Sequence, residues 1–468
     1  MDTTAPAPHF SRELRTSATL AAPLVLGHLS TGLIGFVDSV IAGHHGTRTL
    51  AAVAVGTALF WLPMMVPMGT LMAFPPAVSE LDGAGRRAEI APLFRQALWL
   101  AALLGVVLFA FLSVVTLALE PMGIAPEIRP GAIAFLHGIR WGVPALTLYL
   151  CMRYLSDGLH WTLPTMVLGF GGLIVLVPMG YALTWGIGPL PEMGAGGLGI
   201  ASAAMMWAQA IAFALYLRRS KRFAPLGLFS HFETPRWPIL RNLLATGLPI
   251  GVTVLMEGSL FIVTALLIGR LGGLEAAAHQ IAINVASLCF MIPFGLAEAT
   301  TVRVGHALGR GDRDALRRAA FAGFALMFAT QAASAVLLLA GNDAIAGLYT
   351  ADAAVAALAA TLLLYAAAFQ FPDGVQVLSA GALRGLRDTR RPMLLAAIAY
   401  WAVGMPLGAG LGLGLGWGPQ GMWMGLIVGL TVAAVLLSTR FLRSSRRVPM
   451  HGGATPDESR AVAMTDGA

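Results

Sequence analysis

The chain has 468 residues, of which 57% are hydrophobic and only 11% are charged, and its mean hydropathy is +0.76. A soluble chain of this length needs far more polar surface, so the composition excludes a soluble enzyme or binding domain and indicates a polytopic membrane protein. The net charge of +7 does not indicate nucleic-acid binding, because the basic residues gather at the termini and on one side of the predicted spans.

A membrane-spanning helix needs about 20 largely apolar residues. The sequence contains twelve segments of this kind, which predicts an all-α membrane protein with twelve transmembrane helices. In chain order the predicted spans are 17–43, 50–77, 94–118, 131–153, 164–185, 197–217, 243–268, 276–301, 319–341, 352–378, 392–412 and 421–439.

The chain is an internal repeat. Sliding the sequence by 226 residues aligns Pro23 with Pro249 and Gly69 with Gly295. Six spans per copy is an even number, so both copies enter the membrane in the same orientation, and such parallel repeats place a substrate site between them. We therefore expect two parallel six-helix lobes around a central cavity. The predicted divisions are an N-terminal tail (1–16), an N-terminal lobe (17–222), a linker (223–242), a C-terminal lobe (243–440) and a C-terminal tail (441–468).

The distribution of basic residues predicts the topology. Of the 30 Lys and Arg, 26 are assigned to the termini and to one set of loops. Positive residues mark the cytoplasmic side, so both tails and the linker are expected to be cytoplasmic. The first span is too long for the apolar core of a cleavable signal peptide, so we expect it to be retained. Arg140 is the one basic residue that we place inside a span, near its outer end.

Three acids lie inside apolar spans and have no acidic counterpart in the other copy: Asp38, Glu257 and Asp373. Each costs about 2.5–3.5 kcal/mol to insert even on the most lenient scale. With Arg140 as the only basic residue assigned to a span, ion pairing offers little compensation. Such an acid either holds a proton or binds a cation. We therefore predict that these three acids couple the protein to an ion gradient, which indicates a transporter.

Other polar and aromatic residues are candidates for a supporting role. Gln370 shares a helical face with Asp373, and Gln280 and Asn284 are one turn apart on another span and are expected to look inward. Aromatic rings can bind organic cations, so the tentative lining of a substrate cavity is Tyr149, Trp207 and Trp401. We expect a structural role, near solvated inner span ends or loops, for Glu80, Asp82, Asp157 and Glu298.

Several motifs of soluble enzymes are absent. Lys221 is the only lysine and is followed by Arg222, so the chain has no Walker A motif and is not expected to hydrolyse ATP. The His-Glu-x-x-His and Gly-x-Ser-x-Gly motifs are also absent. Two glycine-rich segments, 194–199 and 416–421, fit the dinucleotide fingerprint but follow no strand, and they occupy equivalent loops of the repeat. We predict no catalytic residues, no enzymatic activity and no cofactor other than a coupling ion.

Several motifs, in the same order and with the same spacing, resemble the multidrug and toxic compound extrusion (MATE) family, most closely its bacterial NorM branch. The resemblance covers roughly 17–440. The segments that carry it are Gly35–Gly43, Leu50–Val55, Ala278–Asn284, Val302–Gly309 and Gly381–Asp388.

The resemblance implies an antiporter of the bacterial cytoplasmic membrane that exports organic cations, such as antimicrobials and dyes, in exchange for inward H⁺ or Na⁺. It implies that Asp38, Glu257 and Asp373 match the acids of spans 1, 7 and 10 of the family, with Glu257 and Asp373 forming the metal site if the ion is Na⁺. We expect a monomer in the lipid bilayer, with small organic cations as its partners and neither nucleic acid nor ATP among them.

The sequence departs from the family pattern at three positions. Leu176 and Gly180, around Pro178, stand where many relatives carry asparagine, so a polar network around Asp38 would lose two amides. Phe369 stands where related chains can carry tyrosine, which removes one possible oxygen ligand near Asp373. These departures leave open the choice between Na⁺ and H⁺.

Other functions make different demands on the sequence. A flippase for lipid-linked oligosaccharides can share the architecture, but it would need a cationic groove for a pyrophosphate. An intramembrane prenyltransferase would need paired aspartates that bind a metal–pyrophosphate, and no such pair is present. A purely structural or receptor role would leave the three acids unexplained.

Overall fold

The computed structural model describes residues 10–448. Within this range the chain is all-helical, and twelve helical segments are long and apolar enough to cross a membrane. The predicted fold class is confirmed. The helices of the first half are α1 (Phe10–His45), α2 (Thr47–Leu71), α3 (Phe74–Gly83), α4 (Ile90–Val114), α5 (Arg129–Ile139), α6 (Val143–Gly158), α7 (Leu163–Trp185) and α8 (Ala195–Arg219). Those of the second half are α9 (Trp237–Gly269), α10 (Gly273–Gly309), α11 (Arg313–Tyr349), α12 (Ala353–Gly385), α13 (Arg390–Ala397), α14 (Met405–Ala409) and α15 (Gly418–Arg446).

Some spans are built from more than one element. The second contains α2 and α3, the third and fourth contain short 3₁₀ turns, and the eleventh alternates between α-helix and π-helix. These connecting elements are η1 (Arg87–Glu89), η2 (Val115–Ala118), η3 (Arg140–Gly142) and η4 (Ala224–Leu226), and the two π-helices η5 (Ile398–Gly404) and η6 (Gly410–Gly414).

The helices run past the ends of the predicted spans. Helix α10 continues to Gly309 and α12 to Gly385, whereas the apolar segments were predicted to end at 301 and 378. Hydropathy detects only the part of a helix that suits the hydrocarbon region. Polar residues beyond it remain helical because every backbone group there still needs a hydrogen-bond partner. This extension places charged side chains on helices that were expected to have ended.

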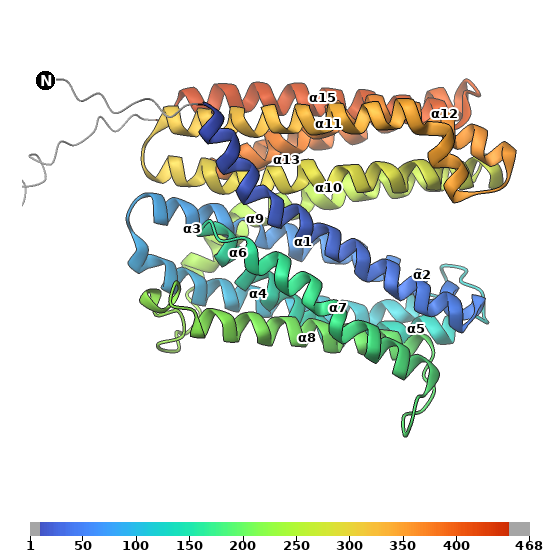
Figure 1. Cartoon of the computed structure of the whole chain (residues 1–468), viewed down its shortest axis with the longest axis horizontal. Coiled ribbons are helices and arrows are strands. Elements are labelled where there is room, and N and C mark those ends of the chain that lie inside the picture. The colour runs from blue at the N-terminus through green and yellow to red at the C-terminus, as the bar shows by residue number, and fades with distance from the viewer. Residues whose placement is uncertain (1–9, 449–468) are drawn as a thin grey trace, which may run out of the picture.

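The two halves of the chain form two lobes (Figure 1). Helices α1–α8 surround one hydrophobic core, and α9–α15 surround a second. Helix α1 crosses diagonally between them (Figure 1), and its Leu20 and Leu24 pack with Leu296 and Leu378 of the C-terminal lobe. The N-terminal part of α1 therefore ties the lobes together.

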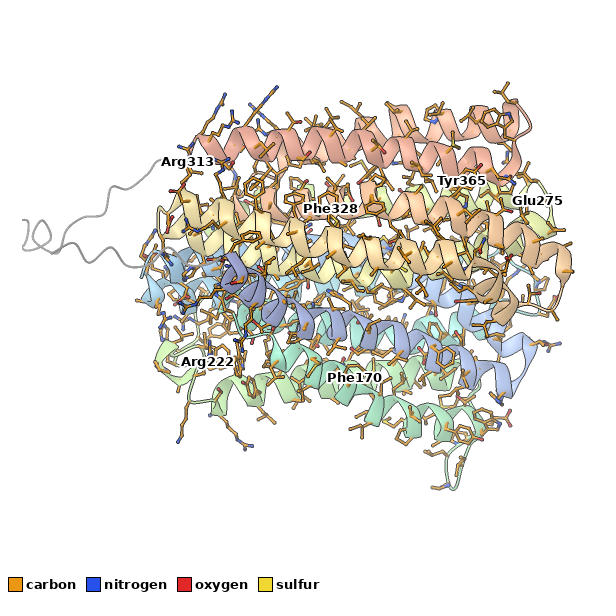
Figure 2. The ribbon with its side chains drawn as sticks, turned by 45° about the horizontal axis from the view of Figure 1, so that its top comes forward. Phe170, Arg222, Glu275, Arg313, Phe328 and Tyr365 are labelled. Carbon is orange, nitrogen blue, oxygen red and sulfur yellow. The ribbon has the colours of Figure 1, made fainter. Side chains whose placement is uncertain are left out.

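We call the end of the bundle where α1 begins and α15 ends the inner end; it lies at the left of Figure 1. In Figure 2, Arg222 and Arg313 lie at this end, Glu275 lies at the opposite, outer end, and Phe170 and Phe328 lie along the sides between them. Both phenylalanines are exposed. An apolar girdle between two charged ends is the surface that a bilayer requires.

Backbone geometry shows that the two copies share one conformation. Gly46 and Gly272, which are 226 residues apart, precede α2 and α10 with φ of 153° and 156°. Gly85 and Gly311, also 226 apart, follow the inner helix ends with φ of 74° and 66°. Side-chain-bearing residues rarely adopt such angles. The repeat detected in the sequence is therefore a repeat of the fold.

The same symmetry relates the contacts between the lobes. A Cβ atom on Gly69 of α2 would lie 2.6 Å from the Cα of Gly251 of α9, and one on Gly295 of α10 would lie 2.9 Å from the backbone N of Val25 of α1. Shifting one pair by 226 residues gives the other, so these are two copies of one contact. Hydrogen bonds and ion pairs between the lobes, among residues 10–448, also lie in the inner half. The lobes are closed against each other at the inner end.

Replacing Gly69 with alanine should destabilise this closed arrangement, because the added methyl group would overlap the backbone of α9 and overpacking typically costs about 1–3 kcal/mol. The measurement is the thermal unfolding midpoint of the detergent-purified protein. Gly32→Ala is the matched control, because a Cβ atom at Gly32 meets nothing within 4 Å. Equal midpoints for the two variants would contradict the contact.

Candidate functional site

The C-terminal lobe holds a buried acid near the middle of α12. Asp373 is 2% exposed, and Gln370 and Gln376, three residues before and after it, are also buried. The three side chains share one face because residues three apart are neighbours on a helix. Oδ1 of Asp373 has no hydrogen-bond partner within the described chain, which is costly for a buried oxygen unless a proton or cation occupies it.

Glu257 of α9 meets this face of α12. Its carboxyl group is hydrogen-bonded to the Gln376 side chain, and it lies close enough to Asp373 for the two carboxyl groups to interact electrostatically. The structure therefore brings together the two acids that the sequence singled out in the second copy. Two neighbouring carboxyl groups cannot both stay charged in an apolar interior without a bound cation.

Tyr400 is a third member of this site that sequence reasoning missed. It is fully buried in the π-helix η5, its hydroxyl has no partner within residues 10–448, and both Glu257 and Asp373 are its electrostatic neighbours. The sequence did offer a signal, because Pro406 and the glycines around it predict an irregular helix, and π-helical turns are frequent at functional sites. The aromatic residue chosen from the sequence was the next one, Trp401.

Gln331 of α11 was also missed. Its Nε2 donates to the backbone carbonyl of Gln370 at 3.0 Å and to the Gln370 side-chain oxygen at 2.9 Å. These bonds fix the orientation of Gln370, the supporting residue that was predicted. An isolated glutamine in an apolar span carries no sequence signal that names its partner.

This group can hold a proton or a hard monovalent cation. It offers two carboxyl groups, the Gln376 side-chain oxygen and the Tyr400 hydroxyl, and the last two lack partners in the described range. Oxygen ligands of this kind suit hard cations. Across residues 10–448 there is no cluster of three or more His, Cys, Asp or Glu side chains that could hold a metal ion. Phe369 lies apart from these oxygens, packed edge-on against Phe261 and Trp423.

Asp38 occupies a separate place in the N-terminal lobe. It is 8% exposed and lies beside Ser202 of α8. One turn along α1, Ile41 packs against Gly180 of α7, where a Cβ atom would come within 3.1 Å of its Cδ1. Leu176 is fully buried. The two departures from the family pattern thus give Asp38 an apolar neighbourhood on α7, and the structure does not join Asp38 to the pair in the other lobe.

The remaining predicted residues are not gathered at one place. Gln280 and Asn284 are exposed on α10, and the Gln280 amide donates to Asn284 at 3.2 Å. Tyr149 is buried in the N-terminal core beside Phe213, so it lines no accessible surface in this conformation. Trp207 is exposed on α8 and donates to the Trp141 carbonyl, and Trp401 is 37% exposed in the other lobe.

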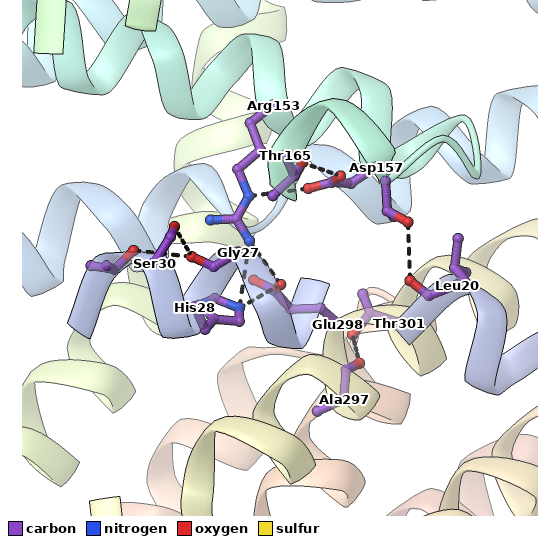
Figure 3. A network of polar contacts seen from close by, with 12 residues as sticks. Leu20, Gly27, His28, Ser30, Arg153, Asp157, Thr165, Ala297, Glu298 and Thr301 are labelled. Carbon is purple, nitrogen blue, oxygen red and sulfur yellow. Dashed lines mark hydrogen bonds and ion pairs between the residues drawn. The ribbon is translucent and has the colours of Figure 1, made fainter. Parts of the chain in front are cut away.

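Two expectations about charged residues were wrong. Arg153 and Arg384 both lie buried inside spanning helices, whereas only Arg140 was placed in a span. Glu298 and Asp157 are not solvated at helix ends either: Arg153 pairs with both, and His28 pairs with Glu298 (Figure 3). The error arose because the helices extend beyond their apolar segments, and helices from distant parts of the chain cover the extensions.

A second group at the inner end is sensitive to pH. His160, in the loop between α6 and α7, packs edge-on against His306 of the other lobe at 4.9 Å, and Asp82 is 3.7 Å from His306. Burial, reinforced by His306, Arg303 and Arg222, lowers the pKa of His160 to about 4, although Asp82 opposes the shift. An unfolded histidine binds its proton near pH 6.5.

Acidification should therefore destabilise the folded protein. Between pH 6.5 and 4 the unfolded state binds more protons than the folded state at this histidine, so stability decreases as the pH falls through that window. We expect a lower unfolding midpoint at pH 5 than at pH 7.5, and a smaller difference in His160→Gln. His44→Gln, at an exposed histidine, should keep the full difference. A full difference in His160→Gln as well would contradict the assignment.

Comparison with known proteins agrees with this architecture. The MatE family model matches residues 23–182 and again 249–409, one match per copy of the repeat. A probable multidrug resistance protein NorM of Xanthomonas campestris is 69% identical over 96% of this chain and 98% of its own length. The multidrug resistance protein PmpM of Pseudomonas aeruginosa is 44% identical over 93% of this chain and 92% of its own length.

Solved structures share the fold at low sequence identity. A multidrug resistance MATE transporter in an outward-facing conformation has a TM-score of 0.85 at 18% identity and covers 95% of this chain and 99% of its own. A eukaryotic MATE transporter has a TM-score of 0.82 at 19% identity and covers 94% of this chain and 99% of its own. The two family-model matches and the close relatives show that the chain belongs to the MatE family.

Proposed function

We propose that this protein is a secondary active antiporter that exports organic cations, including antimicrobials and dyes, in exchange for inward H⁺ or Na⁺. It is a multidrug efflux transporter and a multi-pass protein of the bacterial inner membrane, as the names of its close relatives and its twelve spans support. Transporters of this family are not enzymes. The antiport, the coupling ion and the assignment of site residues are the steps that we add.

The buried acid pair Glu257–Asp373 is the observation that supports coupling. The two groups interact within one lobe, away from any compensating ion pair of their own. Both can be neutral, or they can share a cation, but both cannot be charged and empty at low cost. Binding of an ion from outside therefore changes the charge of the site. We assign Glu257 and Asp373 to ion coupling and Asp38 to a second site in the N-terminal lobe.

The two-lobed architecture supports alternating access. The lobes repeat one fold in one orientation and meet at their inner ends through symmetric contacts. Rocking one lobe against the other would exchange a closed inner end for a closed outer end. We assign the inner end to the cytoplasm, because the basic residues of the termini and loops lie there, and both tails are then cytoplasmic. We propose that the lobes comprise 17–222 and 243–440, that 223–242 links them on the cytoplasmic side, and that the monomer suffices.

A flippase for lipid-linked oligosaccharides is the alternative. It would need cationic side chains free to bind a pyrophosphate. The structure does place Arg153 and Arg384 inside spans, but both are neighbours of the Glu298 carboxyl group. Their charges are committed within the protein, so they do not form a free cationic groove. The carboxyl groups of the candidate site favour a cationic substrate.

Reconstituted protein should transport a fluorescent organic cation when an H⁺ or Na⁺ gradient is imposed. Each gradient is applied separately to liposomes, with the membrane potential clamped and then varied, because the potential contributes about 2.3 kcal/mol per charge per 100 mV. The active gradient identifies the coupling ion, and the effect of the potential reports the stoichiometry. An absence of transport under both gradients would refute the antiporter.

Neutral substitutions at the acid pair test the site. Glu257→Gln and Asp373→Asn should each lower gradient-driven transport by at least about tenfold, because the site can no longer change its charge on ion binding. Glu120→Gln is the control, since Glu120 is 79% exposed, and it should transport like the parent. Parent-like transport by either site variant would refute its role in coupling.

A further inference from the structure

A buried ionic cluster joins the two lobes in the inner half of the molecule (Figure 3). Oε2 of Glu298, on α10 of the C-terminal lobe, accepts a hydrogen bond from Nη2 of Arg153 at 3.0 Å. The same oxygen lies 2.8 Å from Nε2 of His28. Arg153 on α6 and His28 on α1 belong to the N-terminal lobe. All three side chains are about 90% buried, so these contacts must break if the lobes separate here.

Separation would strand a buried charge on each lobe unless each lobe offers a replacement partner. Breaking a buried ion pair is strongly destabilising when one charge is left uncompensated. The N-terminal lobe does offer one. Oδ2 of Asp157, one turn along α6, lies 3.3 Å from Nε of Arg153, and Thr165 of α7 fixes the Asp157 carboxyl by donating to Oδ1 at 2.7 Å. Arg153 therefore keeps a carboxylate partner when it leaves Glu298.

The C-terminal lobe offers Arg384. This residue of α12 is 8% exposed, and its Nε and Nη2 atoms have no hydrogen-bond partner within the described chain. The electrostatic neighbours of its guanidinium group include Glu298 and Glu257. Arg384 and Glu298 line the same cavity of about 20 Å³, which is room for about one water molecule. Residues 10–448 contain no ion pair between these two side chains, so the cavity separates them in this conformation.

The backbones that carry Glu298 and Arg384 are fastened to each other. The Thr301 hydroxyl on α10 donates to the Gly381 carbonyl on α12 at 2.8 Å. Thr301 lies three residues after Glu298, and Gly381 lies three residues before Arg384. The separation of the two side chains is therefore preserved when the lobes move, and only side-chain rotation is needed to bring them into contact.

We propose that Glu298 exchanges partners during the transport cycle. With the inner end closed, Glu298 binds Arg153 and His28 of the other lobe. When the inner end opens, Glu298 binds Arg384 of its own lobe, and Arg153 retains Asp157. Each lobe then contains a complete ion pair in both conformations. Glu298, Arg153 and Arg384 thus form a lock that closes the inner end without leaving an unpaired buried charge when it opens.

Arg384 also connects this lock to the proposed coupling site, a step that rests on the proposed function. Asp373 and Arg384 are eleven residues apart on α12, about 16 Å at 1.5 Å per residue. The long Arg384 side chain is an electrostatic neighbour of Glu257 as well as Glu298. A cation bound at Glu257 and Asp373 weakens the attraction of Glu257 for Arg384 and leaves Arg384 freer to take Glu298. Ion binding at the coupling site would then favour opening of the inner end.

The lock is tested by measuring the distance between the lobes at the inner end. Spin labels are placed at Ala84, after α3, and at Asp314, at the start of α11, which are both exposed. The background is the full chain with Cys151 and Cys289 replaced by alanine. Pulsed electron paramagnetic resonance in nanodiscs gives the ratio of long to short distances, which reports the ratio of open to closed inner ends.

The two arginines should have opposite effects on this ratio. Arg153→Gln removes the bond between the lobes and should raise the ratio by about fivefold or more, the scale of a typical coupling between conformational states. Arg384→Gln removes the partner needed in the open state and should lower the ratio, most visibly when combined with Arg153→Gln. Glu257→Gln should raise it. Arg140→Gln, at an arginine outside this cluster, should leave it unchanged.

The Glu298→Gln background shows whether the effect of Arg384 passes through Glu298. There Arg384→Gln should have no further effect. A shift in the same direction for Arg153→Gln and Arg384→Gln, or an equal effect of Arg384→Gln with and without Glu298, would overturn the proposal. If Arg384→Gln does not fold, Arg384→Lys, with its single-point charge, should lower the ratio in the same direction but less. The distance ratio does not depend on transport, so failure of the antiport experiment leaves this result interpretable.

Discussion

The structure depends on one constraint: a charge placed in the apolar interior of a membrane protein needs a partner, a proton or a bound cation. The molecule meets this constraint in two ways. In the inner half, Glu298 and Asp157 are paired with Arg153 and His28. Near the middle of α12, Asp373 has an orphaned oxygen and a second acid as its neighbour. The first arrangement is complete within the protein, and the second is completed by an ion from outside.

These two arrangements separate the roles of the buried charges. Paired charges hold helices of different lobes together, and their strength depends on the lobes staying in contact. The acid pair lies within a single lobe, so its occupancy can change without separating the lobes. Because Arg384 lies near both Glu257 and Glu298, the two arrangements are also neighbours. Occupancy of one and closure of the other can then influence each other through one side chain.

Much of the fold was predictable from the sequence, whereas the site was predictable only in part. Twelve apolar segments and a 226-residue repeat predicted the spans and their shared orientation, because hydropathy and periodicity are local properties. Glu257 and Asp373 were predicted because an acid is conspicuous in an apolar span. Tyr400 and Gln331 were missed, since a tyrosine or glutamine in a span is ordinary until its neighbours are known. Arg153 and Arg384 were placed outside the spans, because hydropathy does not reveal how far a helix continues.

The sequence by itself determined the class of protein, the number of spans, the symmetry of the halves and three acids that need an explanation. Each follows from the cost of exposing polar groups to lipid, which every residue carries with it regardless of its neighbours. Only the tertiary structure decided which acids are paired. Pairing depends on side chains such as His28, Arg153 and Glu298, up to 270 residues apart in the chain, and their meeting depends on how the two lobes pack at the inner end.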